Sequence, residues 1–112
     1  MRLLLDTCTF LWVVEGSPKL STPARELFKD PANEVFLSAV SAWEVAQKHV
    51  AGRLPLPETV ERFIFHQREA HGILPLPLDE SAVFHLQRLP ALHRDPFDRM
   101  LICQAIAHSM AI

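Results

Sequence analysis

Three short, largely apolar runs along the chain predict β-strands. They cover residues 3–5, 34–37 and 73–76. Runs of this length without polar alternation are typical of strands that are buried on both faces of a sheet. Pro75 within the third run favours an edge strand, because proline has no N–H to donate to the hydrogen-bond ladder.

Helical spacing of apolar residues and helix-end signals predict helices between and after these runs. Ser41 and Glu44 have the Ser-x-x-Glu spacing of a capping box, and Gly72 stands where a helix ends. Asp95 before Pro96 has the form of an N-cap followed by proline in the first turn. The expected helices cover residues 9–15, 23–30, 41–51, 57–71, 80–89 and 96–110.

The alternation of strands and helices predicts the fold class. It indicates an α/β protein, with three α/β/α layers around a mostly parallel central sheet. No repeat or linker divides the 112 residues, so we expect a single domain over residues 1–112. A further connection after the last helix would deliver a fourth strand, but only a few residues follow. We therefore expect the last strand to be missing and the domain to be truncated there.

Composition and charge narrow the class of protein. With 49% hydrophobic and 21% charged residues, the chain has the composition of an ordinary globular protein. The formal net charge of -2 argues against a surface that binds polyanions everywhere. However, if several of the 13 acidic side chains gather in one site, basic side chains dominate the rest of the surface. A nucleic-acid partner therefore stays open.

The N-terminal sequence and the cysteines indicate in which cellular compartment the protein is expected. The start, MRLLLDTCTFLWVV, imitates a signal peptide, but Asp6 interrupts its apolar stretch and no small-residue cleavage site follows. No apolar run reaches the roughly 20 residues that a membrane span requires. Cys8 and Cys103 form no paired motif, as expected for free thiols in a reducing compartment. We expect a cytoplasmic protein with no membrane partner.

Acidic residues gather, by sequence position, where a parallel sheet binds its ligands, beyond the carboxyl ends of the strands. Asp6 follows the first strand, Glu44 lies in the helix after the second, and Asp95 and Asp98 begin the last helix. Each also has a purely structural interpretation. Asp6 and Asp95 can cap helices, and Glu44 can complete the capping box or pair with Lys48. For Asp95 the capping interpretation is favoured.

Of the four acids, Asp98 is the one whose position is least explained by a role in starting a helix. It shares a helix face with Leu101 and Ala105 on a nearly all-apolar helix, which predicts a buried carboxylate. Two like charges about 5 Å apart repel by around 3 kcal/mol at an effective dielectric of about 20, so we expect a cation between Asp98 and Asp6. Without clustered thiols or imidazoles, Mg²⁺ or Mn²⁺ is favoured over zinc. Such an ion can bind phosphate oxygens and activate water, so the reaction we expect is phosphodiester hydrolysis. Glu44 would orient the attacking water or bind a second ion.

Three segments resemble the PIN-domain ribonucleases of the VapC toxin family. LLLDTCTFLW resembles the opening strand with the first acid, SAVSAWEVAQK the helix with the second, and HRDPFDRMLICQA the third acid at the start of the last long helix. The match spans nearly the whole chain in the family's order. Together the three motifs are specific, although any one alone is weak.

The resemblance implies an activity, a site and partners. It implies a Mg²⁺-dependent endoribonuclease that cleaves structured RNA such as tRNA, acts as a homodimer and is silenced by a small antitoxin. Asp6, Glu44 and Asp98 would be the catalytic acids, with Asp6 and Asp98 binding the metal ion. Thr7 and Thr9 would support the first acid by hydrogen bonding, and Asp95 would be a neighbour of the site.

Basic residues near the acids are the candidates for RNA contacts. Lys48, Arg94 and Arg99 lie nearest in sequence, followed by Arg53. Such side chains hold phosphates in protein–RNA contacts, although a charge beside a helix end is more often simply solvated.

The chain departs from the family pattern at two places. Relatives continue into a further strand with a fourth acid, so either the chain is truncated or the site works with three acids or uses Asp95. Cys8 stands where relatives commonly carry a polar residue. One alternative is a metal-free module whose acids receive basic residues of a protein partner. A haloacid-dehalogenase-type phosphatase is a weaker alternative, because Cys8 occupies the place of its second acid.

Overall fold

The computed structural model describes residues 1–90 and 95–112, so Arg94 lies outside the described residues. The strands lie close to their predicted positions: β1 (Arg2–Leu5), β2 (Glu34–Ser38) and β3 (Leu74–Leu76). The helices are α1 (Thr7–Glu15), α2 (Thr22–Lys29), α3 (Ala39–Val50), α4 (Val60–His71), α5 (Glu80–Phe84) and α6 (Pro96–His108), and the 3₁₀ turn η1 (His85–Arg88) follows α5.

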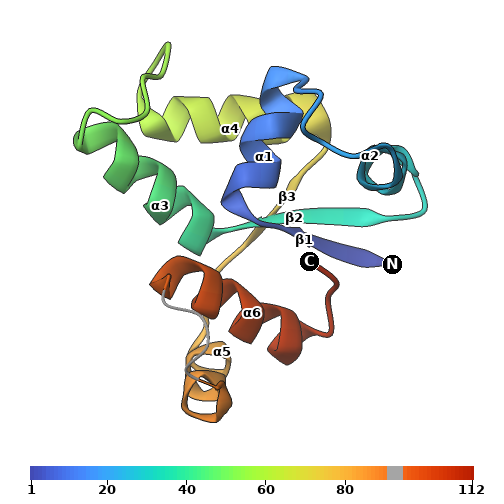
Figure 1. Cartoon of the computed structure of the whole chain (residues 1–112), viewed down its shortest axis with the longest axis vertical. Coiled ribbons are helices and arrows are strands. Elements are labelled where there is room, and N and C mark those ends of the chain that lie inside the picture. Colours follow the sequence, from blue (N-terminus) through green and yellow to red (C-terminus); the bar gives the residue numbers. More distant parts are fainter. Residues whose placement is uncertain (91–94) are drawn as a thin grey trace.

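The strands form a parallel sheet in the order β1-β2-β3 (Figure 1). Leu5 pairs with Leu37, so the carboxyl ends of β1 and β2 lie at the same level. After α6 the chain returns to β1, where the Leu4 N–H donates to the Ala111 carbonyl at 2.7 Å. Ala111 also forms a parallel bridge with Leu3. After α6 the chain thus takes a position beside β1 at Ala111.

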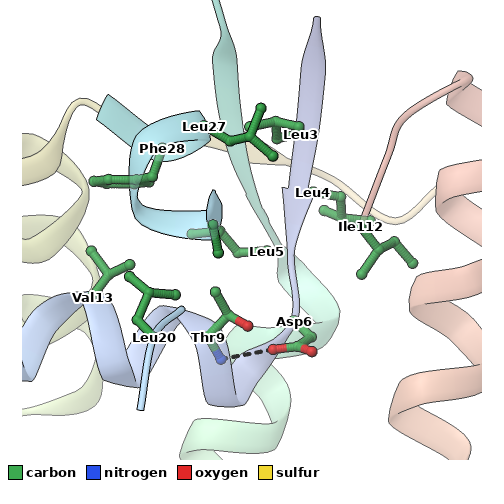
Figure 2. A pocket seen from close by; sticks show the side chains of 11 residues that line it. Leu3, Leu4, Leu5, Asp6, Thr9, Val13, Leu20, Leu27, Phe28 and Ile112 are labelled. Carbon is green, nitrogen blue, oxygen red and sulfur yellow. Dashed lines mark hydrogen bonds between the residues drawn. The ribbon is translucent and has the colours of Figure 1, made fainter. Parts of the chain in front are cut away.

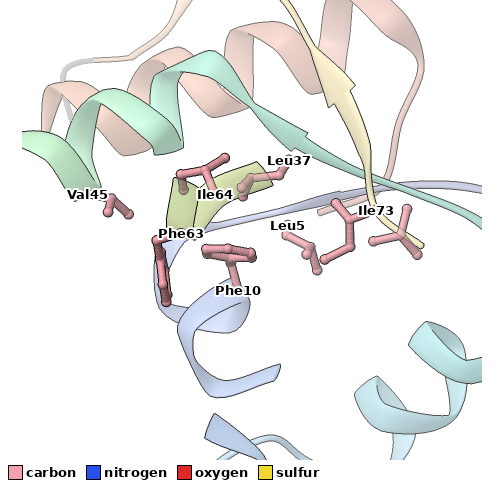
Figure 3. Packing of buried hydrophobic residues seen from close by; sticks show 8 residues of the cluster. Leu5, Phe10, Leu37, Val45, Phe63, Ile64 and Ile73 are labelled. Atoms are coloured by element: carbon pink, nitrogen blue, oxygen red, sulfur yellow. The ribbon is translucent and has the colours of Figure 1, made fainter. Parts of the chain in front are cut away.

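Two apolar clusters, one on each face of the sheet, hold three layers together. Helices α1, α2 and α4 lie on one side of the sheet, and α5 and α6 lie on the other (Figure 1). The first cluster contains Leu5, Phe10, Val35, Leu37, Val45, Phe63, Ile64 and Ile73 (Figure 3). The second contains Leu4, Val40, Leu76, Leu101, Ala105 and Met110. Consecutive residues of β1 thus face opposite layers, and the predicted three-layer α/β fold is confirmed.

Several predicted helix starts or ends were wrong, and three of them have a local reason. Helix α3 begins at Ala39 because the Ser38 hydroxyl, not Ser41, is the N-cap and accepts from the Val40 N–H at 2.9 Å. Helix α4 begins after its N-cap Thr59 rather than at 57. The predicted helix over 80–89 tightens into η1 before Pro90, a common way for a last turn to close. No described helix is long and apolar enough to cross a membrane.

A buried polar side chain joins α6 to the sheet. Gln104 is fully buried, and its carbonyl oxygen Oε1 accepts a hydrogen bond from the Ser38 hydroxyl. Its amide Nε2 donates to the Pro77 carbonyl at 3.2 Å. Because Ser38 also caps α3, this one side chain connects the end of β2, the segment after β3 and the middle of α6.

Pro75 lies on the open edge of β3, as its position in the sequence predicts. The Glu34 N–H bonds to the Met1 carbonyl, so alternate residues of β2, including Leu37, turn their N–H groups toward β3. In a parallel ladder, the residue opposite such a position points its own backbone N–H and C=O groups away from the neighbouring strand. Pro75 is opposite Leu37 and therefore faces the free edge, where its missing N–H breaks no ladder bond.

We predict that Gln104→Leu destabilises the fold by about 1–3 kcal/mol. The apolar side chain leaves the Ser38 hydroxyl and the Pro77 carbonyl without their buried partner. Urea unfolding followed by circular dichroism measures the change. Gln87→Leu, at an exposed position of η1, is the control and should stay within about 0.5 kcal/mol of the parent protein. Equal stability of the two variants would contradict the structural role of Gln104.

Candidate active site at the carboxyl ends of the strands

Asp6 leaves β1 and caps the helix that follows. Its Oδ1 accepts from the Thr9 backbone N–H at 2.7 Å, and its side chain is partly buried (Figure 2). The capping interpretation of Asp6 is therefore confirmed. It does not exclude a second role, because a carboxylate has two oxygens and about four acceptor positions.

Thr7 and Thr9 support the site differently from the prediction. Thr9 contributes its backbone N–H to Asp6. The Thr7 hydroxyl donates to the Ser41 hydroxyl oxygen at 3.1 Å, and both side chains are buried. Thr7 therefore ties the first turn of α1 to α3 rather than bonding to Asp6. This bond fixes the spacing between the helices that carry Asp6 and Glu44.

Glu44 is a buried acid with one paired and one unpaired oxygen. It is 6% exposed, and its Oε2 lies 2.8 Å from the Lys48 Nζ. That hydrogen bond raises the pKa of Lys48 above its ordinary value. Its Oε1 is buried and has no hydrogen-bond partner among the residues that the structure describes. The predicted pairing with Lys48 is confirmed, whereas the capping box was wrong because α3 begins at Ala39.

Asp98 is exposed, which corrects the prediction that it is buried. It stands in the first turn of α6, and only from the next turn, at Leu101, does the helix face enter the core. The helical periodicity was right, but in the first turn Phe97 packs against the second cluster while Asp98 points away from it into solvent. Asp98 and Asp6 nevertheless line one small cavity, which is completed by Leu101, Ile102 and Ile112.

The exposed Cys8 thiol follows the residues Asp6 and Thr7 and feels the charges of the acids. Partial desolvation is the main cause that raises its pKa, and the negative charges of Asp6, Glu44 and Asp98 raise it further, while the positive charge of Lys48 acts in the opposite direction. Asp6 and Asp98 line one cavity, whereas Glu44 lines a neighbouring groove between α3 and α6.

Asp95 caps α6, as the favoured interpretation predicted. Its Oδ1 accepts from the backbone N–H groups of Phe97 at 2.8 Å and Asp98 at 3.3 Å. On its other side it borders an open groove between the two helices. This α3–α6 groove is lined by Glu44, Gln47, Lys48, Arg53, Asp95, Pro96 and Phe97. Among the basic candidates, Lys48 and Arg53 face this groove, while Arg99 donates to the Pro90 carbonyl at 2.8 Å.

A second cavity, of about 170 Å³, lies along β1 on the other side of Asp6. Figure 2 shows its lining, in which Leu5 of β1 lies on the side of Val13 and Phe28, while Leu4 lies on the other side of the strand next to Ile112. Apart from Asp6 and Thr9 the labelled side chains are apolar. This cavity has no second carboxylate and is not the candidate active site.

The site fits a hard cation held by few protein ligands. Over the described parts of the chain, no three histidine, cysteine or acidic side chains are grouped closely enough to hold a metal ion together. Mg²⁺ does not need three, because it keeps several waters and is commonly bound by one or two carboxylates plus substrate phosphates. Asp6 and Asp98 provide two carboxylates at one cavity, and in the part of the chain that the structure describes the buried Oε1 of Glu44, beside the neighbouring groove, has no hydrogen-bond partner.

Sequence reasoning missed two elements of the site region. Ser41 was interpreted as a helix cap, although it is the buried acceptor of the Thr7 hydroxyl. Trp43 and Phe97 were not singled out, yet their rings meet between α3 and α6 with centroids 4.7 Å apart. Their positions beside Glu44 and Asp98 in the sequence were the available signal.

Comparisons with known proteins agree with this geometry. A family model described as the PIN domain matches residues 3–112. Ribonuclease VapC16 from Mycobacterium tuberculosis (strain ATCC 25618 / H37Rv) is 33% identical over 72 residues, which cover 61% of this chain and 51% of the relative. The chain thus spans about half the length of this curated relative. No solved structure matches. The resemblance predicted from the three sequence motifs is confirmed.

We predict a measurable coupling between Thr7 and Ser41. Ser41→Ala alone strands a buried hydroxyl and should cost about 1–3 kcal/mol, whereas adding Thr7→Val removes the stranded group. The double variant should therefore be more stable than the sum of the single effects predicts, by about 0.5–1.5 kcal/mol. Urea unfolding of the four proteins measures this difference. Strict additivity would show that the two hydroxyls do not bond.

Proposed function

Because the chain belongs to the PIN-domain family, we propose that it is an endoribonuclease toxin that hydrolyses structured RNA such as tRNA with Mg²⁺ or Mn²⁺. The observation that carries the proposal is the small cavity shared by Asp6 and Asp98, which come from opposite ends of the sequence. The name of the similar mycobacterial protein, Ribonuclease VapC16, supports the same activity.

Asp6 and Asp98 would hold the metal ion. Asp6 is oriented by its bond to the Thr9 N–H, and Asp98 by the first turn of α6, which Asp95 caps. A divalent ion bound there would supply an activated water and offset negative charge on the phosphate oxygens. The Thr9 N–H thus holds the Asp6 carboxylate, whereas the cap of Asp95 fixes the backbone from which the Asp98 side chain projects.

Glu44 would act as the general base. Lys48 holds its Oε2, so only Oε1 is left to accept a proton from the attacking water. Proton transfer to a positioned carboxylate typically contributes about 10²–10⁴-fold to a rate. Lys48 and Arg53 border the adjoining α3–α6 groove and would contact RNA phosphates.

The proposal includes partners and a compartment. We expect a small antitoxin protein to inhibit the enzyme by covering the acidic cavity, a homodimer as the active form, and the cytoplasm as its place of action. These expectations are supported by the resemblance to VapC toxins. Purified toxin and antitoxin, mixed in RNase assays, test the inhibition.

A metal-free protein-binding module is the second candidate. It is favoured by the lack, among the described residues, of three grouped metal-ligating side chains. In that function the acids would receive basic residues of a partner protein. The PIN-domain match argues against the phosphatase alternative, and Cys8 stands where that chemistry needs an acid.

We predict that Asp6→Asn and Asp98→Asn each reduce Mg²⁺-dependent cleavage of tRNA by about 100-fold or more. Each change removes a charge that would hold the metal ion at the phosphate. Cleavage of end-labelled tRNA, resolved by gel electrophoresis, measures the rate. Asp30→Asn, at an exposed position after α2, is the matched control and should cleave like the parent protein.

Two outcomes would contradict the proposed site. Cleavage that both asparagine variants retain would place the activity elsewhere. Cleavage by the parent protein that survives excess EDTA would exclude the metal, and a protein that never cleaves RNA but binds a partner through the same acids would favour the metal-free module.

We predict that the neighbouring aspartates of α6 differ in their structural role. Asp98→Asn should change the free energy of unfolding of the metal-free protein by no more than about 0.5 kcal/mol, because the side chain is exposed. Asp95→Ala should cost about 1 kcal/mol, because it removes the N-cap. Urea unfolding in EDTA measures both. A larger loss in Asp98→Asn than in Asp95→Ala would assign Asp98 to the fold instead of the site.

A further inference from the structure

An exposed tryptophan stands beside the candidate active site. Trp43 of α3 is 56% exposed, although the next residue, Glu44, is buried. The buried face of α3 consists of Val40, Ser41, Glu44 and Val45. The indole therefore lies outside the core, and core packing does not explain it. Single exposed apolar side chains are common, so its position and orientation must carry any inference.

Phe97 fixes the orientation of the indole. The two rings meet edge to face, with centroids 4.7 Å apart and planes inclined by 78°. This contact joins α3 to the first turn of α6, and the helices pack against each other there (Figure 1). Trp43 directly precedes Glu44, and Phe97 directly precedes Asp98. The aromatic pair is thus attached to two of the three acids and cannot lie far from the RNA phosphate that they would cleave.

Charge next to the pair fits a nucleic acid. Phe97 lines the α3–α6 groove together with Lys48 and Arg53. Sites for single-stranded nucleic acid combine cations that follow the phosphates with aromatic rings on which bases stack. Here the cations line the groove, and Phe97, which also lines it, contacts the exposed Trp43.

We propose that Trp43 is a stacking platform for an unpaired base of the RNA substrate, with Phe97 bracing the indole and Lys48 and Arg53 contacting the adjoining phosphates. This inference rests on the proposed function, because it concerns the substrate of the same site. An unpaired base is required, since a base within a duplex has both faces covered by its neighbours. Trp43 would thereby select single-stranded positions for cleavage.

Binding without cleavage provides the first test. In the Asp6→Asn protein with Mg²⁺, a fluorescein-labelled single-stranded oligoribonucleotide is titrated by anisotropy. Trp43→Leu should weaken binding about tenfold, the scale on which base–aromatic stacking operates, and Trp43→Phe should restore most of the affinity. Phe65→Leu, at a position of α4 that is 57% exposed, is the matched control and should bind like its parent.

A duplex and a cleavage assay complete the test. The same strand annealed into a blunt duplex should bind equally to the Trp43→Leu variant and its parent. With Asp6 intact, Trp43→Leu should raise KM for single-stranded RNA about tenfold and leave kcat nearly unchanged. Circular dichroism confirms that the variants are folded.

Several results would overturn the platform. The first is an affinity for the single strand that Trp43→Leu leaves unchanged, and the second is an equal loss of affinity for duplex RNA. The third is a parent protein that binds no oligonucleotide. The fourth is a change of oligomeric state in Trp43→Leu, which would make the indole part of a protein interface. If the protein cleaves RNA and substitutions of Trp43 change neither binding nor KM, the stacking role of Trp43 is refuted and the proposed nuclease function stands. If the protein binds single-stranded RNA through Trp43 but does not cleave it, the nuclease function is refuted and the stacking role of Trp43 stands.

Discussion

The parallel register of β1 and β2 is the constraint on which the site depends. Because Leu5 pairs with Leu37, Asp6 and Ser38 leave the sheet at the same level, and each caps the helix that follows. Two helices therefore start side by side from neighbouring strands. The bond between Thr7 and Ser41 then fixes their first turns, and Glu44 is carried to the same end of the sheet as Asp6. A slip in this register would separate these acids.

Helix α6 completes the site from the opposite layer. It is anchored by Gln104 and packs through Leu101 and Ala105 on the sheet, while Asp98 in its first turn is exposed. The three acids consequently have different surroundings. Asp6 is partly buried, Glu44 is buried beside a lysine, and Asp98 is exposed. In the proposed function, the more accessible carboxylates of Asp6 and Asp98 would bind a hydrated ion, and the buried carboxylate of Glu44 would accept a proton.

The sequence was sufficient for the order of the elements, the layers and the placement of Asp6 and Asp98 at the same end of the sheet, because these follow from hydrophobic runs and from the polarity of a parallel sheet. It was insufficient where two local choices compete. Ser38 and Ser41 are both credible caps, and only packing selects Ser38. The periodicity of α6 could not reveal where along the helix the buried face begins, so the burial of Asp98 was predicted wrongly. Contacts between distant residues, such as Trp43 with Phe97, have no sequence pattern of their own.

The proline in β3 has a consequence for how molecules of this protein meet one another. An uncovered sheet edge is a template on which the strand of a second molecule can pair, and this is a common beginning of aggregation. At the β3 edge such a strand would meet no N–H at Pro75, so a continuous ladder between molecules could not form. Leu74 and Leu78 can therefore stay 41% and 39% exposed beside this edge while the sheet is prevented from growing from chain to chain.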